Sequence, residues 1–281
     1  MNTAKKIVLC FSLFCLYTIS EYQTVFAQSI WLDRSHEKTI VLEIQKPDFD
    51  GEDQTTFMTT SWFLYGRFPL STNVNMVAEI PFSHYKLDAE TYYFMENEGQ
   101  SAFGNPYVGF EFYNEKKTVF GEIGLRLPMT PKEDASLAQS SGAVTEFVER
   151  TEAFARDVLP VSVLINYMKT EDSGLMFRLR GGPIVWLATG NRNDTEWFVV
   201  YSIQGGYHSE KFNILAGLSG RWFVSAEDAA FSEATFHQFG IAATVDLGTF
   251  QPGLMLKLPL DEDLSDTIDL TFGLTLGFIL N

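Results

Sequence analysis

The segment that decides the fold is the C-terminal stretch IDLTFGLTLGFIL, from Ile268 to Leu280. Large apolar side chains occupy every second position, and mostly small or polar residues stand between them. A β-strand places alternate side chains on opposite faces, so one face of this segment is wholly apolar. The pattern predicts a strand that separates an apolar environment from a more polar one.

The same alternation recurs along the chain in runs of about ten residues that are separated by turn residues. Twelve strands are predicted, and ten to fourteen stay compatible with the pattern because residues 129–157 could hide another hairpin. The predicted strands cover residues 38–46, 56–69, 74–85, 105–114, 118–128, 158–169, 175–187, 197–208, 212–225, 235–246, 251–260 and 267–280.

The connections between these strands alternate between tight turns, such as 114–117, and longer polar segments, such as 86–104. Short turns at one end, long loops at the other and an even strand count are typical of an outer-membrane barrel. Strands of about ten residues are long enough to cross a membrane at a tilt. We therefore predict an all-β fold, a transmembrane antiparallel up-and-down β-barrel. The alternative is a secreted soluble β-protein, in which the apolar faces form a core.

The first 27 residues have the features of a secretory signal peptide. Lys5 and Lys6 precede an apolar run from Ile7 to Ile19, and Val25-Phe26-Ala27 offers small residues before a cleavage point. We expect residues 28–281 to form the barrel domain, in the outer membrane of a Gram-negative-type cell. Its expected surroundings are outer-membrane lipids and lipopolysaccharide, and its expected assembly partner is the barrel-assembly machinery.

The composition excludes several classes of protein. A formal net charge of −16 argues against nucleic-acid binding, which needs Lys and Arg to neutralise phosphates. Both Cys residues lie within the predicted signal, so the mature chain has neither a Cys nucleophile nor a Cys-based zinc site. The four His residues are not predicted to join a Ser–His–acid arrangement or a three-ligand metal site. We therefore expect no cofactor, no metal and no enzymatic activity; a lipid-modifying enzyme is the alternative.

The predicted inward faces hold many charged side chains. By strand parity, the residues assigned to the lumen are Glu79, Glu111, Glu122, Arg126, Arg178, Arg180, Arg221, Asp246, Lys257 and Asp269. Such charges either line a hydrated pore or pair with one another in a filled interior, and a barrel of twelve strands admits both. Arg178 and Arg180 share one strand face, and hairpin geometry is expected to place Asn166 opposite Arg178. This cationic pair favours anionic or carboxylate-bearing solutes, unless lumen Glu residues neutralise it.

The longest connection, residues 129–157, contains a helix-like segment, GAVTEFVERTEAFARDV, which begins at Gly142. Phe147, Phe154 and Val158 recur at roughly helical spacing. Two placements remain open. The helix either folds into the mouth, where Phe147 and Phe154 would constrict the pore, or lies across the extracellular rim.

The stretch FGNPYVGFEFYNEKKTVFGEIGLRLPMTP, from Phe103 to Pro131, follows the strand NMVAEIPF and ends in Leu127-Pro128-Met129. In this region, roughly residues 57–131, the chain resembles the outer-membrane transporter family of aromatic-compound (phenol meta-pathway) degradation. Ala102 and Asn105 depart from the Gly and Asp of the family's turn. The resemblance implies passive uptake of small molecules, hydrophobic ones among them. The alternative function is a structural or adhesive barrel with a plugged lumen.

Overall fold

The computed structural model describes residues 29–32, 34, 38–49, 57–86, 99–131, 136–171, 174–190, 194–226 and 229–280. The predicted signal peptide, residues 1–27, lies outside the described residues. In the described part of the chain, no helix is both long enough and apolar enough to cross a membrane.

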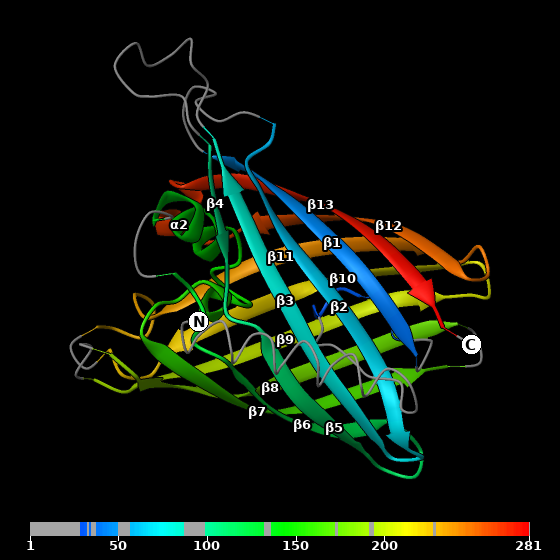
Figure 1. Cartoon of the computed structure of the whole chain (residues 1–281). Helices are drawn as coiled ribbons and strands as arrows, with labels where there is room; N and C mark the ends of the chain where they lie inside the picture. The colour runs from blue at the N-terminus through cyan, green and yellow to red at the C-terminus, as the bar shows by residue number, and fades with distance from the viewer. Residues whose placement is uncertain are drawn as a thin grey trace, which may run out of the picture.

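The described strands close into an antiparallel barrel with twelve strand positions (Figure 1). The strands are β1 (Thr39–Phe49), β2 (Thr60–Ser71), β3 (Val74–Tyr85), β4 (Gln100–Phe103), β5 (Tyr107–Tyr113), β6 (Val119–Arg126), β7 (Val158–Thr170), β8 (Leu175–Ala188), β9 (Glu196–His208), β10 (Phe212–Phe223), β11 (Thr235–Val245), β12 (Phe250–Pro259) and β13 (Ile268–Ile279). Closure comes from β1, which pairs with both β2 and β13. The predicted fold class and strand count are confirmed.

Two of the thirteen strands share one position in the wall. β4 pairs with one half of β3 and β5 with the other half, so together they form a single interrupted strand. The interruption falls at Gly104 and Asn105, where the Asn105 amide donates to the Ala153 carbonyl at 2.6 Å. A Cβ atom added to Gly104 would lie 2.1 Å from the same carbonyl. Glycine is therefore required where the long loop meets the wall.

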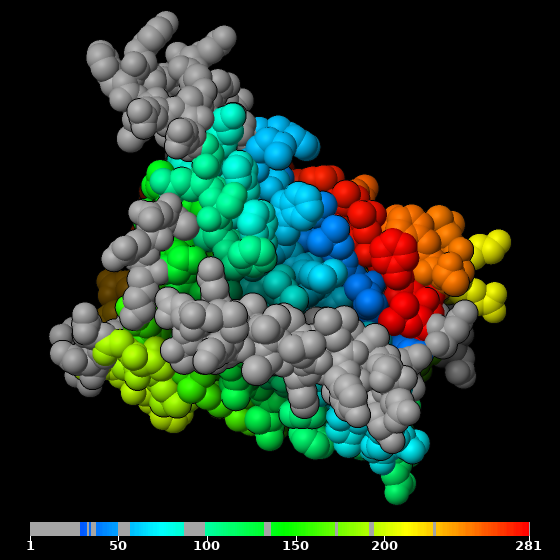
Figure 2. Space-filling model, viewed as in Figure 1, coloured from blue at the N-terminus to red at the C-terminus, as the bar shows by residue number. Residues whose placement is uncertain are grey.

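The two faces of the barrel wall differ in polarity. Along β6, Ile123 and Leu125 are exposed on the outside, whereas Glu122 and Arg126 are buried inside. In β13, Phe272 is exposed and Thr271 and Thr275 face the interior. An apolar exterior around a polar interior is the arrangement of a membrane barrel and the inverse of a soluble β-sandwich. Figure 2 shows β3, β2, β1 and β13 side by side in one continuous outer wall.

Candidate functional site in the barrel lumen

The long connection between β6 and β7 folds into the lumen. It contains α2 (Ser136–Thr145) and the short 3-10 helix η1 (Thr151–Ala153), and we call residues 136–157 the inward segment. The ring centroid of Phe154 lies 6.0 Å from that of Phe63, and that of Phe147 lies 4.9 Å from that of Phe236. Both candidate constriction residues therefore pack against the wall and anchor the segment inside the mouth.

The position of the helix corrects the sequence-based expectation. The predicted helical stretch began at Gly142, but α2 starts earlier and ends at Thr145. After α2, Arg150 pairs with Glu43 and Glu79. Glu146 pairs with Lys257.

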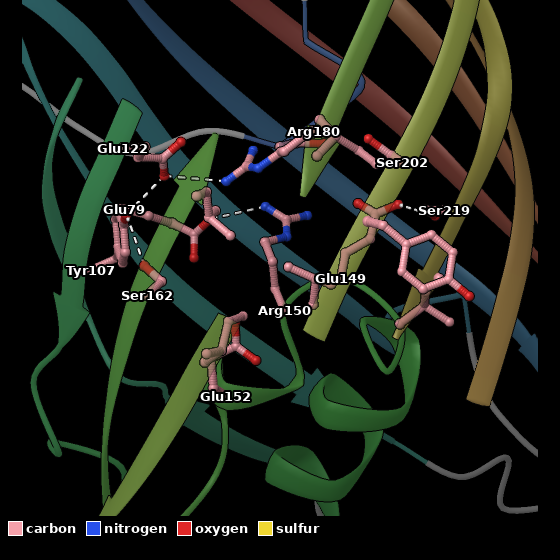
Figure 3. A pocket seen from close by; sticks show the side chains of 18 of the residues that line it. Glu79, Tyr107, Glu122, Glu149, Arg150, Glu152, Ser162, Arg180, Ser202 and Ser219 are labelled. Carbon is pink, nitrogen blue, oxygen red and sulfur yellow. Dashed lines mark hydrogen bonds and ion pairs between the residues drawn. The ribbon is translucent and has the colours of Figure 1, made fainter. Parts of the chain in front are cut away.

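Arg150 of the inward segment lies at the centre of an ion-pair network. Its Nη2 atom lies 2.7 Å from Glu43 Oε1 on β1 and 2.7 Å from Glu146 Oε1. Its Nη1 atom lies 2.9 Å from Glu79 Oε2 on β3. The guanidinium also lies over the Phe63 ring, 3.9 Å from its centroid. Figure 3 shows Arg150 extending from the inward segment towards Glu79. One side chain thus joins the segment to two strands.

Three other predicted lumen cations are buried in the same region. Arg126 Nη2 lies 2.7 Å from Glu79 Oε1, and Lys257 Nζ lies 2.8 Å from Glu146 Oε1. Arg221 Nη2 lies 2.7 Å from Glu152 Oε2 in η1. Parity placed Glu79, Arg126, Arg221 and Lys257 inside, and the structure buries all four.

The loop carboxylate Glu152 is held in its charged form by its neighbours. Burial by itself would raise the pKa of Glu152, but the charges of Arg221 and Arg126 and the hydrogen bond from Arg221 outweigh it. The net effect is a pKa below the ordinary value for Glu. The contact between the inward segment and β10 is therefore a true ion pair at neutral pH.

A second network surrounds Glu111 nearer the tight-turn end of the barrel. Arg34 Nη1 lies 3.3 Å from Glu111 Oε1, and Arg67 Nε lies 3.0 Å from Glu111 Oε2. The Tyr113 hydroxyl donates to Glu111 Oε2 at 2.7 Å. Glu111 is thus buried among two guanidinium groups and a phenol.

Residues 29–32 and Arg34 also enter the lumen, which the sequence did not predict. The Trp31 indole Nε1 donates to Glu149 Oε1 at 2.6 Å, so this segment contacts the inward segment directly. Arg178 Nη1 donates to the Leu32 carbonyl at 2.8 Å. The lumen is therefore occupied by two separate stretches of chain that meet each other.

Arg180 and Glu122 form a third group on the opposite wall. Arg180 Nη2 lies 3.2 Å from Glu122 Oε1, which also accepts a 2.8 Å hydrogen bond from the Tyr107 hydroxyl. Asn166 pairs in register with Arg180, not with Arg178 as expected from the sequence. β7 runs on to Thr170, and the Glu171 amide donates to the Leu175 carbonyl at 2.7 Å, so the turn is centred one residue later than expected. Gly174, at a φ of +86°, donates to the Glu171 carbonyl within this turn. Moving the centre of the turn by one residue shifts the register by two.

Two acidic residues that parity assigned to the lumen lie at strand ends, and only one of them departs from the prediction. Asp269 is exposed, because the pairing of β1 and β13 shifts between Asp48 and Phe49 and the alternation is broken there. The assignment of Asp269 to the lumen wall is wrong, since parity holds only while the ladder is regular. Asp246 directly follows β11 in a turn, where its Oδ1 accepts the Gly248 amide at 2.8 Å and its Oδ2 accepts from the buried Gln251 at 3.2 Å.

The histidines do not assemble a metal site among the described residues. His84 Nδ1 lies 2.8 Å from Ser101 Oγ on β4, and no described carboxylate hydrogen-bonds to that ring. His237 Nε2 lies 2.7 Å from the Tyr201 hydroxyl on the outer face. Sequence analysis missed the Ser101 partner because β4 was not predicted.

Two adjoining cavities lie along the wall from β5 to β10. The first, of about 60 Å3, lies between the inward segment and this wall, and Figure 3 shows its lining. The second, of about 20 Å3, lies against β7, β8 and β9. Ile30, Arg180 and Ser202 line both cavities. The first cavity also borders the ion-pair network, because Glu79 and Arg150 line it.

No family model matches the sequence, and no curated protein matches it. Among solved structures, an outer-membrane channel from Pseudomonas putida F1 has a TM-score of 0.60 at 12% identity, covering 90% of this chain and 99% of that one. The KdgM porin has a TM-score of 0.51 at 9% identity, covering 86% and 99%. LpxR from Salmonella typhimurium has a TM-score of 0.51 at 9% identity, covering 86% and 100%. At these identities the likeness establishes the fold alone, an antiparallel β-barrel of the kind that these outer-membrane proteins have.

Proposed function

We propose that this protein is an outer-membrane channel through which small molecules pass by diffusion along the two adjoining cavities. The observation that carries the proposal is the shared lining by Ile30, Arg180 and Ser202, which joins the cavities along one wall. Charged side chains in this lining, such as Arg180 and Glu149, favour hydrated or charged solutes over purely apolar ones, because an apolar solute would leave buried charges without solvent. The resemblance of Phe103–Pro131 to the aromatic-compound transporter family supports the same general role.

We place the constriction of the proposed path where the two internal stretches meet. Trp31 and Glu149 join them through the 2.6 Å hydrogen bond, and both Ile30 and Glu149 line the first cavity. Movement of either stretch would widen the path without disturbing the strand ladder. The inward segment and residues 29–32 therefore form the proposed constriction.

The test is conductance of the refolded chain from Gln28 to Asn281 in a planar lipid bilayer. We expect discrete current steps from folded wild-type barrels. Ser202→Phe places a ring where the two cavities adjoin and should reduce the step size. Thr275→Phe adds the same ring to a buried lumen position that lines neither cavity and serves as the matched control.

Folding of each variant is checked by the heat-dependent shift in electrophoretic mobility that folded barrels show. A folded wild-type chain that stays electrically silent would reject the channel and favour a structural barrel with a plugged lumen. Equal conductance in wild type and a folded Ser202→Phe variant would reject the proposed path.

A further inference from the structure

The second cavity is bordered by a compact group of polar side chains on three neighbouring strands. Asn166 on β7 pairs in register with Arg180 on β8, and Arg180 pairs with Ser202 on β9. Arg178 on β8 pairs in register with Gln204 on β9. All five residues line the cavity. The strand ladder thus holds them on one continuous interior surface.

Three nitrogen atoms of this group are buried without a hydrogen-bond partner. They are Asn166 Nδ2, Arg180 Nη1 and Gln204 Nε2. All three are donors, and Asn166 and Gln204 are only 4% and 2% exposed. A buried donor without an acceptor is costly, so three around one cavity indicate an acceptor-rich occupant.

The charge around the cavity has the same sign throughout. Arg34, Arg178 and Arg180 line it, and no carboxylate is among the described residues that do so. The carboxylates that bind two of these cations, Glu111 and Glu122, contact them outside this lining. Arg180 uses Nη2 for Glu122, which leaves Nη1 on the other edge of its guanidinium. Positive charge and unsatisfied donors therefore coincide.

We propose that this cavity is a binding site for the carboxylate group of a small organic anion. A carboxylate has two oxygens that accept several hydrogen bonds, and guanidinium and amide donors match that geometry. The role of the site in permeation rests on the proposed channel function, whereas binding itself does not. The site would select anionic solutes on their way through the barrel.

The test is ligand-observed NMR on the refolded chain, with acetate as the probe and acetamide as its uncharged isostere. We expect acetate to bind and acetamide to bind at least about tenfold more weakly, the factor that losing one charge-assisted hydrogen bond gives. Gln204→Leu and Asn166→Leu should each weaken acetate binding by a similar factor. Gln251→Leu is the matched control, because Gln251 is a buried lumen amide that lines neither cavity.

Equal affinity of the wild-type chain for acetate and acetamide would overturn the proposal without reference to any variant. The proposal would also be overturned if folded Gln204→Leu and Asn166→Leu chains bound acetate with the same affinity as the Gln251→Leu chain. A barrel that binds acetate but conducts no current would refute the channel and leave the site standing.

Discussion

Arg150 Nη2 and Glu43 Oε1 lie 2.7 Å apart, although the two residues are separated by 107 positions in the sequence. Their side chains are only 6% and 0% exposed. A buried ion pair gains little over a well-packed apolar pair, but removing one partner leaves an uncompensated charge in a low-dielectric site. The net free energy that this contact contributes is therefore small. Losing one partner would cost much more, and that cost keeps the inward segment against β1.

Replacing Arg150 by Met should destabilise the barrel and loosen the inward segment. Glu43, Glu79 and Glu146 would lose their shared cation, and the expected cost is about 3–5 kcal/mol. We expect a lower unfolding midpoint in urea and larger, noisier current steps. Lys169→Met is the control, because its exposed pair with Glu171 should contribute less than about 1 kcal/mol. An Arg150→Met barrel as stable as the control would show that the network does not anchor the segment.

Deleting residues 140–155 should raise single-channel conductance. The deletion removes Arg150, Glu152 and Phe154, each of which is buried inside the barrel. The strand ladder does not depend on these residues, so the wall is expected to close without them. The measurement compares step size in bilayers for folded wild-type and deleted chains. Unchanged conductance would mean that the inward segment does not constrict the path.

Strand alternation predicted much of the interior correctly because it is a local property of the chain. Lys257 and Glu122 face inward for the reason that the sequence suggested, namely that every second side chain of a strand points to the same face. Glu43 and Arg67 lie in predicted strands and could have been found by the same rule. Asp269 fails it because the ladder shifts register where that strand begins.

The partners of these charges could not be predicted from the sequence. Arg150 and Arg34 belong to irregular segments, whose positions depend on contacts with strands far along the chain. No periodic pattern describes such segments, and only the closed barrel brings them to Glu43 and Glu111. The cross-strand neighbour of Asn166 shows the same limit on a smaller scale, because a turn centred one residue later than expected paired Asn166 with Arg180.

Ile165→Arg should destabilise the barrel through contact with lipid. Ile165 lies near the middle of β7 and is 67% exposed on the outer face. A cation at the bilayer midplane of a barrel costs about 2–4 kcal/mol, falling to about 0–1 kcal/mol near the interfaces. Leu247→Arg, in the turn after β11, is the control for the interface. Urea titrations in liposomes that give equal stability for both variants would contradict the assignment of this face to lipid.

Gly240→Ala should displace Trp31 from the lumen. A Cβ atom at Gly240 would lie 2.4 Å from the Trp31 ring, so the indole must move and its hydrogen bond to Glu149 should break. The chain from Gln28 contains no Cys, so a single Ser29→Cys substitution provides a unique probe at a buried position. We expect a membrane-impermeant maleimide to label that Cys severalfold faster in the Gly240→Ala background. Gly121→Ala is the matched control, because a Cβ atom there meets nothing within 4 Å. Equal labelling rates in the two backgrounds would show that Trp31 does not hold residues 29–32 in the lumen, and would remove this stretch from the proposed constriction.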